Sequence, residues 1–246
     1  MKQKGNMHGA TAISSSDVTS ITVRGHDLMQ LMGSVSFTEY FMLLLLGRLP
    51  DDNERSMLDA CLVAIAEHGL TPSVKAARMT RAADPAALQG AVAAGILGCG
   101  TVVLGTAELA AKLLARAVKV AAERGEDASA VAREICAAEH AKGSRLAGFG
   151  HPLHRPEDPR AQRLLQLADQ HGTAGPHVRM ARAFAACIDE VYARRLPLNV
   201  SGAIGAVMLD IGFPIEVMKG VPILARTAGI IAHLHDDVLS PMGLDL

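Results

Sequence analysis

The sequence contains no tryptophan, and aromatic residues make up only 3% of its 246 residues. An excess of charge of one sign is also missing, because 24 Lys and Arg residues are balanced by 25 Asp and Glu residues. Proteins that bind nucleic acids usually present a basic surface to the phosphates and often aromatic rings to the bases. The near-zero net charge and the scarcity of rings therefore argue against a nucleic-acid partner.

Cysteine is rare as well. The four cysteines have no C-x-x-C spacing and lie at positions Cys61, Cys99, Cys136 and Cys187. A chain of this length buries enough apolar surface to fold without disulfides, so we expect four reduced thiols in the core. The first residues, MKQKGNMHGATAISSSD, lack the apolar segment of a secretory signal. Both features lead us to expect a cytoplasmic protein.

Long hydrophobic runs are the third absence. The charge-free stretch 91–107, AVAAGILGCGTVVLGTA, is interrupted by four glycines and is followed by Glu108 and Lys112. A helix that crosses a membrane needs about 20 predominantly apolar residues in succession. The stretch predicts a buried helix that is broken by a glycine-rich turn, and we expect no membrane partner.

Alanine and leucine are abundant, and they recur at helical spacing in segments that end at glycine, proline or polar residues. A further helix is expected after Asp84 as N-cap and Pro85 at the first helical position. The other expected helices cover residues 37–46, 51–67, 73–81, 108–124, 128–141, 161–171, 178–194, 203–211, 214–220 and 224–238. The predicted fold class is all-α.

Histidines and arginines interrupt this apolar background. His68 follows a helix, His151 and His154 lie in a loop rich in glycine and proline, and Arg226 lies in an apolar helix. Guanidinium groups bind carboxylates in pairs of hydrogen bonds, and imidazoles transfer protons near neutral pH. Together these residues indicate a pocket for a small dicarboxylate. Taken singly, a histidine beside a helix end is more often a cap or a core hydrogen-bonding group. An isolated arginine on an apolar helix is as often a solvated residue whose stem covers apolar surface.

The motifs give little support for a metal or a nucleotide. His151 and His154 form an H-x-x-H pair, and His233 lies two residues before His235, but neither pair has carboxylate or cysteine partners at ligand spacing. The sequence has neither a G-x-x-x-x-G-K-[ST] loop nor a G-x-G-x-x-G turn after a strand. We expect no metal and no tightly bound cofactor.

Several segments resemble the citrate synthase superfamily, in particular its short citryl-CoA lyase branch, which also forms the C-terminal module of ATP-citrate lyase. In chain order they are VRGHDLMQL, SFTEYFMLLLLGRLP, EHGLTPSVKAAR, GFGHPLHRPEDPRA, LNVSGAIGAVMLDIGFP and ARTAGIIAHLHDD. The resemblance implies a two-lobed, all-α homodimer or higher homo-oligomer. Residues 1–105 and 201–246 would form the large lobe and the dimer interface, and residues 106–200 the small lobe. It also implies a CoA thioester and a small di- or tricarboxylate as ligands, with CoA as part of the substrate.

The resemblance further implies roles for single residues. His68 contacts the oxaloacetate moiety, and His151 exchanges a proton with the oxaloacetate carbonyl or the citryl hydroxyl, for which it is the expected base. The residues implied in substrate binding are Arg160, Arg226, His154 and Gly150, of which the two arginines hold carboxylates. His154 and its neighbour Arg155 face either the CoA phosphates or water.

Two departures from the family pattern affect the expected reaction. Val103 or an apolar neighbour replaces the histidine of the family's LHGGA segment, as in lyase-type members. Ser201 stands where the family's NVD segment has its acid/base aspartate, and a hydroxyl is a much weaker base. We count Ser201, His68 and His151 as the catalytic residues.

On this basis we expect a carbon–carbon lyase rather than a citrate synthase. It would cleave citryl-CoA, or a related 3-hydroxy-3-carboxyacyl-CoA, to acetyl-CoA and oxaloacetate or another α-keto acid. The loss of the aspartate leaves two alternatives open. One is a pseudoenzyme or regulatory subunit that binds a dicarboxylate and CoA, and the other is a structural subunit of a larger lyase assembly.

Overall fold

The computed structural model describes residues 11–154 and 156–243. The chain divides into two compact units, Met1–Ser56 and Met57–Leu246. The lobe boundaries expected near residues 106 and 200 both fall inside the second unit and stay predictions.

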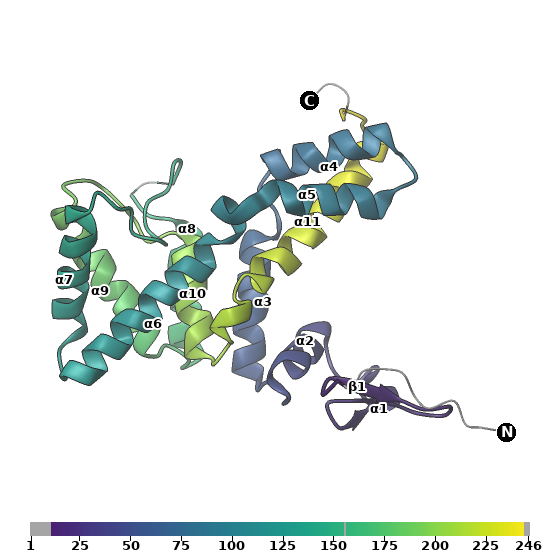
Figure 1. Cartoon of the computed structure of the whole chain (residues 1–246), viewed down its shortest axis with the longest axis horizontal. Helices are drawn as coiled ribbons and strands as arrows, with labels where there is room; N and C mark the ends of the chain where they lie inside the picture. The colour runs from purple at the N-terminus through teal and green to yellow at the C-terminus, as the bar shows by residue number, and fades with distance from the viewer. Residues whose placement is uncertain (1–10, 155, 244–246) are drawn as a thin grey trace. The chain divides into compact units, whose positions relative to one another are not determined.

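The first unit contains a small antiparallel sheet that the sequence analysis did not predict. Its strands are β1 (Ser14–Ser16), β2 (Ile21–Val23) and β3 (His26–Asp27), in the order β1-β2-β3, and they precede the short helix α1 (Leu28–Leu31) (Figure 1). Strands of two or three residues are too short to show an alternating apolar pattern. The guanidinium of Arg24 donates two hydrogen bonds to the Leu44 carbonyl, at 3.0 and 2.6 Å, and so attaches the sheet to the next helix.

That helix, α2 (Phe37–Leu46), confirms the segment predicted at residues 37–46. Ser36 caps its N-terminus by accepting a hydrogen bond from the Glu39 N–H, while the Glu39 carboxylate accepts one from the Ser36 N–H. Gly47 ends the helix in the left-handed conformation, at φ 74°. Both end signals were therefore readable in the sequence.

The second unit is helical. Helix α3 begins in the first unit and continues into the second. The elements are α3 (Asp52–Ala66), α4 (Pro72–Ala83), α5 (Leu88–Leu104), α6 (Thr106–Arg124), α7 (Ala128–Ala141), α8 (Pro159–Gln170), α9 (Pro176–Val191), α10 (Val200–Asp210), the 3-10 turn η1 (Ile215–Val217) and α11 (Gly220–Leu239). The all-α prediction is confirmed, with the small sheet as its exception.

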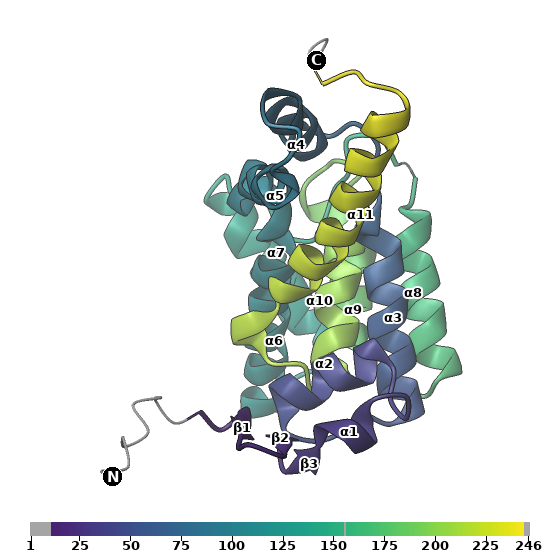
Figure 2. The same ribbon diagram turned by 90° about the vertical axis from the view of Figure 1, so that its right-hand side faces the viewer.

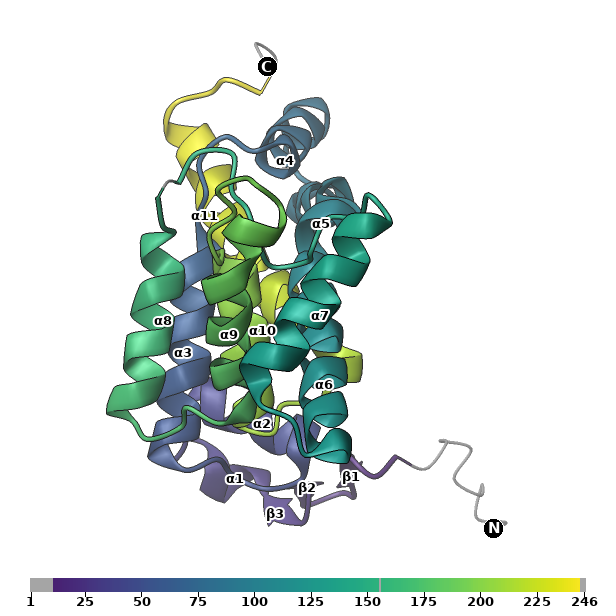
Figure 3. The same cartoon turned by 90° about the vertical axis from the view of Figure 1, so that its left-hand side faces the viewer.

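Helix α10 lies at the centre of one group of helices and contacts α6, α8 and α9 (Figure 3). Its residues are almost all buried, and it carries no charged side chain before Asp210. A helix that is apolar on every side is stable only when other helices surround it. A second group consists of α4, α5 and α11, which pack on one another through Ala77, Ala91, Ile230 and Leu234 (Figures 1 and 2).

Two local predictions near α5 have opposite outcomes. The expected break is present, because the chain leaves helical geometry at Gly100, with φ 55° and ψ −170°. The expected N-cap at Asp84 is wrong, because Asp84 ends α4 and α5 begins only at Leu88. A residue before proline is excluded from helical geometry, and here Asp84 and Pro85 form a turn between the two helices.

The segment expected to be helical at residues 214–220 forms only the 3-10 turn η1, over Ile215–Val217. Within residues 11–154 and 156–243, no helix combines the length and the apolar character that crossing a membrane requires.

The N-terminus of α9 is held by a buried carboxylate from the end of α10. Asp210 accepts hydrogen bonds from the main-chain N–H groups of Gly175, His177 and Val178, at 2.7 to 2.9 Å. Its Oδ1 also lies 2.8 Å from Nδ1 of His177, and the carboxylate is fully shielded from solvent. These hydrogen bonds join α9 to α10, two neighbouring helices of the group around α10.

We expect Asp210→Ala to lower the free energy of unfolding by about 3 kcal/mol, because several buried donors lose their acceptor. Asp169→Ala is the matched control: its carboxylate is half-exposed and pairs with Arg182, so the expected loss is about 0.5 kcal/mol. Urea unfolding followed by circular dichroism measures both. Equal losses in the two variants would show that Asp210 does not hold α9 in this way.

Candidate active site

Two glycine-containing segments form one rigid junction. Gly148 has a φ of 86°, and a Cβ at this position would lie 2.8 Å from the Cα of Gly202. The Gly148 carbonyl accepts a hydrogen bond from the Asn199 N–H at 2.9 Å, and the Asn199 amide donates to the Gly150 carbonyl at 2.9 Å. Only glycine allows this close approach of two backbones. The GFGH and LNVSG segments, about 50 residues apart in the chain, are therefore neighbours in the fold.

This junction holds His151 in one orientation. Its Nδ1 accepts hydrogen bonds from the main-chain N–H groups of Leu153 and His154, at 3.1 and 2.9 Å. A nitrogen that accepts two hydrogen bonds carries no proton, so the neutral imidazole is protonated on Nε2. Burial and the neighbouring His154 lower the pKa of His151, which favours this neutral form. His151 therefore presents an N–H donor from Nε2.

A buried ion pair lies next to His151. Asp158 has no exposed surface and caps α8, while its carboxylate pairs with Nε and Nη2 of Arg160 at 3.1 and 3.0 Å. It also accepts a hydrogen bond from the Val200 N–H at 3.0 Å, which connects α8 to α10. Burial favours the neutral acid, but the hydrogen bonds from Arg160 and Val200 outweigh it and hold the pKa of Asp158 below its ordinary value. The sequence analysis did not select Asp158, although its place two residues before Arg160, as an N-cap, was a usable signal.

Arg160 extends from this pair toward both histidines. Its Nη1 lies 3.2 Å from Nδ1 of His68, and its Nη2 lies 3.4 Å from Nε2 of His151. In the contact with His68, the Arg160 guanidinium donates to Nδ1 of the imidazole. In the tautomer assigned to His151, the second contact places two N–H donors opposite each other. A ligand oxygen that lies to one side of both nitrogens would accept a hydrogen bond from each.

Arg226, on α11, contributes the second guanidinium. No hydrogen-bond or ion-pair acceptor for it exists among the described residues of the chain, although its side chain is partly buried. Burial, together with the charges of Arg226 and Arg160, lowers the pKa of His68. A partly buried cation without a protein anion is the usual mark of a site for an anionic ligand.

These residues line one cavity of about 410 Å³. It brings together six of the seven residues singled out from the sequence, namely His68, Gly150, His151, Arg160, Ser201 and Arg226. The polar lining residues that the sequence analysis missed are Thr71, Ser73, Cys99, Thr106 and Asn199. None of the described lining residues is an aspartate or a glutamate.

His154 does not line this cavity. Its ring contacts that of His151 at a tilt of 32°, with ring centroids 4.4 Å apart. Arg155 lies outside the described residues. Val103, which stands near the family's missing histidine, does line the cavity.

A second cavity, of about 420 Å³, shares Gly150, His151 and Pro152 with the first. Its basic residues are Arg145, Arg194 and Arg195. Arg195 donates to Asp189 at 2.9 Å, whereas the guanidinium groups of Arg145 and Arg194 have no partner in the described part of the chain. The cavity therefore offers uncompensated positive charge next to His151.

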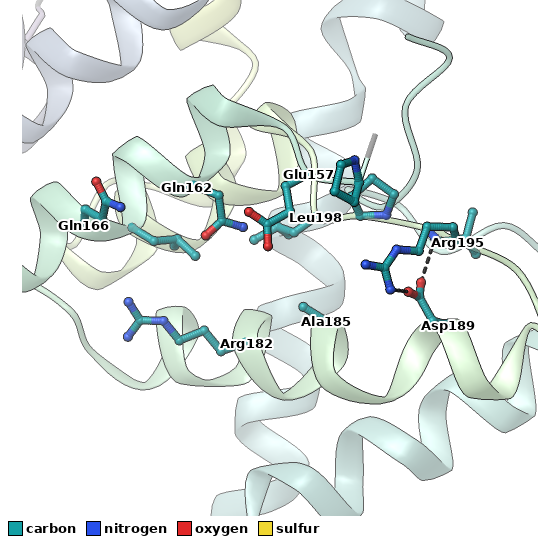
Figure 4. A pocket seen from close by; sticks show the side chains of 12 residues that line it. Glu157, Gln162, Gln166, Arg182, Ala185, Asp189, Arg195 and Leu198 are labelled. Atoms are coloured by element: carbon teal, nitrogen blue, oxygen red, sulfur yellow. Dashed lines mark hydrogen bonds and ion pairs between the residues drawn. The ribbon is translucent and has the colours of Figure 1, made fainter. Parts of the chain in front are cut away.

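A third cavity, of about 360 Å³, lies between α8 and α9 and contains none of the residues predicted from the sequence (Figure 4). Glu157 and Gln162 lie on one side of it, and Arg182 and Ala185 on the other (Figure 4). Arg182 is paired with Asp169 at 2.6 Å, so its guanidinium is already neutralised. This cavity lacks the unpaired cations of the other two.

Comparison with known proteins gives one consistent family. Residues 50–240 match the family described as citrate synthase, C-terminal domain. Over 194 residues the chain is 34% identical to a protein of Mycobacterium tuberculosis provisionally named citrate synthase 2, and the match covers 75% of this chain and 48% of that protein. The chain spans about half the length of the curated relatives it matches.

Solved structures agree with this match. Citryl-CoA lyase from Hydrogenobacter thermophilus superposes with a TM-score of 0.83 at 30% identity, over 94% of this chain and 88% of that one. ATP citrate lyase from Methanothrix soehngenii, solved in complex with citrate and coenzyme A, has a TM-score of 0.80 at 21% identity, over 95% of this chain and 39% of that one. The second likeness shows the fold alone. The helical, citrate synthase-like fold expected from the sequence is confirmed.

We expect both imidazoles to titrate below the ordinary histidine value of about 6.5. Arg226→Gln should raise the pKa of His68, because a nearby positive charge is removed, and leave that of His151 unchanged. Nuclear magnetic resonance of labelled histidines measures both. Because the unfolded chain binds these protons first, the free energy of unfolding should fall as the pH drops below about 6.5. An unchanged pKa of His68 in Arg226→Gln would show that the charge of Arg226 does not lower the pKa of His68.

Proposed function

The chain belongs to the citrate synthase family, and from this premise we propose that it is a lyase that cleaves citryl-CoA or a related 3-hydroxy-3-carboxyacyl-CoA. The products are acetyl-CoA and oxaloacetate or another α-keto acid. The observation that carries the proposal is the pair of N–H donors, on His151 and Arg160, that face each other at 3.4 Å. The oxygen of a tertiary hydroxyl, which becomes the ketone oxygen, can accept a hydrogen bond from both when it lies to one side of the two nitrogens.

The reaction breaks the bond between the hydroxyl-bearing carbon and the thioester methylene carbon. The hydroxyl loses its proton, its oxygen becomes the ketone of the α-keto acid, and the electron pair of the broken bond forms the thioester enolate. That enolate takes up a proton at carbon to give acetyl-CoA, so no net proton is consumed. Donors aimed at the oxygen stabilise the alkoxide as it forms.

His151 acts in this scheme as a donor to the alkoxide. To act as the base at Nε2, which the sequence led us to expect, it would need its proton on Nδ1, where two main-chain N–H groups already donate. We therefore assign the hydroxyl proton to a water molecule in the cavity. Ser201, on the first turn of α10, donates to the enolate oxygen, and water returns the proton to carbon.

The carboxylates of the substrate are assigned to the two arginines. The guanidinium of Arg226 has no acceptor among the described residues. Arg160 pairs with Asp158 through Nη2, while its Nη1 points away from that pair, toward His68. The absence of acidic residues from the described lining leaves the cavity positive. A small di- or tricarboxylate complements such a site.

The CoA portion of the substrate is assigned to the second cavity. It begins at Gly150 and His151, where the thioester would lie, and it carries Arg145 and Arg194 without partners among the described residues. The diphosphate and 3′-phosphate of CoA are anions that such arginines bind. CoA then enters only as part of the substrate. A homodimer, a cytoplasmic location and the absence of a tightly bound cofactor stay predictions.

A second candidate function is supported by the same cavity. Ser201 and the other hydroxyl groups of the lining are weak bases, and the described lining holds no carboxylate that could accept a proton. A pocket of this composition suits a pseudoenzyme or regulatory subunit that binds a dicarboxylate and CoA without turning over.

We expect the purified protein to release oxaloacetate from citryl-CoA, measured as NADH oxidation by added malate dehydrogenase. His151→Ala should lower kcat by about 10²–10³-fold, because a donor to the developing alkoxide is lost. His235→Ala is the control, since His235 is exposed and has no role in the site. Turnover only after Ser201→Asp would favour the pseudoenzyme over the lyase.

The double variant Arg145→Gln with Arg194→Gln should raise the KM for citryl-CoA about tenfold or more and change kcat little, because phosphate binding is remote from the bond that breaks. Arg163→Gln provides the control, because Arg163 is exposed on α8 and lines neither cavity. Steady-state kinetics over a range of citryl-CoA concentrations separates the two constants. A fall in kcat at constant KM would contradict the placement of CoA.

A further inference from the structure

We propose that His233 and Arg78 are positioning residues for His68, and that they act through the carboxylate of Glu67. The inference rests on the proposed function only in taking His68 as part of the active site. The four side chains come from α4, from α11 and from the segment that follows α3.

The connection begins at the main chain of the active-site segment. The Glu67 carboxylate accepts hydrogen bonds from the N–H groups of His68, at 2.7 Å, and of Gly69. These bonds bend the chain just after α3 and aim the His68 imidazole toward Arg160. The orientation of His68 therefore depends on where the Glu67 carboxylate is held.

His233 holds that carboxylate from the neighbouring helix. Its Nε2 lies 2.7 Å from Oε2 of Glu67, a close polar contact that is not a hydrogen bond. Its Nδ1 lies 3.2 Å from Nη2 of Arg78. Since an arginine can only donate, Nδ1 is the acceptor and Nε2 carries the proton. The Nε2–H of His233 therefore lies beside the Glu67 carboxylate, at ion-pair distance.

Arg78 fixes His233 in turn. Only 2% of its side chain is exposed, and it pairs with Asp236 at 2.6 Å and with Asp237 at 3.1 Å. Asp237 also accepts a hydrogen bond from the Met242 N–H at 3.1 Å, so the segment that follows α11 is included in the same network. Removing a partner from a buried charge is costly, which keeps this arrangement in one conformation.

Backbone contact brings the two helices close enough for this network. Gly229 lies where α11 crosses the end of α3, and a Cβ at this position would collide with the Ala66 carbonyl oxygen. His233 is one helical turn further along α11 and therefore lies opposite Glu67. A network that served stability alone would not need to end on the main chain of His68.

The test compares His233→Asn with His233→Gln. The glutamine amide reaches the position of the imidazole Nε2 and can still place an N–H beside Glu67, whereas the asparagine amide reaches only the position of Nδ1. We expect His233→Asn to lower kcat/KM for citryl-CoA about tenfold or more, because a shift of 1 Å in a site can cost as much. His233→Gln should recover most of this loss. His235→Asn, an exposed position on the same helix, should have no effect.

The second readout is the titration of His68 by nuclear magnetic resonance, on variants that circular dichroism shows to be folded. His233→Asn should move the pKa of His68 back toward about 6.5, as the imidazole moves away from the two arginines and toward solvent. His233→Gln should change it less. An unchanged His68 titration in His233→Asn overturns the proposal. This readout needs no turnover, so it tests the positioning role even if citryl-CoA is not cleaved and the proposed function fails.

Discussion

The site depends on one buried carboxylate, that of Asp158. It caps α8, accepts a hydrogen bond from the Val200 N–H at the start of α10, and pairs with the guanidinium of Arg160. Those contacts join the loop that carries His151 to the helix that carries Ser201. A buried anion is stable only when donors surround it, so each partner of Asp158 is held in place by the need to compensate its charge. Arg160 can then extend toward His68 and His151 without becoming an unpaired cation.

The chemical character of the cavity follows from an excess of hydrogen-bond donors over strong acceptors. Arg160, Arg226 and His151 all present donors, and the described lining has hydroxyl and thiol groups but no carboxylate. Such a site binds anions and stabilises an oxygen that becomes negative, but it lacks a strong base. Cleavage of a citryl-type thioester needs a site that stabilises a negative oxygen, because negative charge develops on the tertiary oxygen before the carbon–carbon bond breaks. The same shortage of bases explains why binding without turnover is the main alternative.

Long segments with clear end residues were predicted correctly from the sequence, whereas elements of two or three residues were not. Helix α2 was predicted to the residue because its apolar segment is followed directly by Gly47, which ends the helix in the left-handed conformation. The three strands before it were missed because pairs and triplets of residues show no periodicity. Asp84 was misplaced because an Asp-Pro pair suits both the start of a helix and a turn, and the contacts between α4 and α5 select the turn. Propensity alone cannot distinguish such cases.

Residue type, spacing and order were enough to indicate the helical class, the family resemblance and most of the residues that line the cavity. Which atoms face one another became known from the tertiary structure. It assigned the proton of His151 to Nε2, separated His154 from the cavity, and placed the carboxylates of Asp158 and Glu67 against Arg160 and the main chain of His68. Most of these partners are near neighbours in the chain, but their contacts depend on the backbone and side-chain dihedral angles that each residue adopts. Tertiary packing sets those angles, and residue type and spacing alone do not specify them.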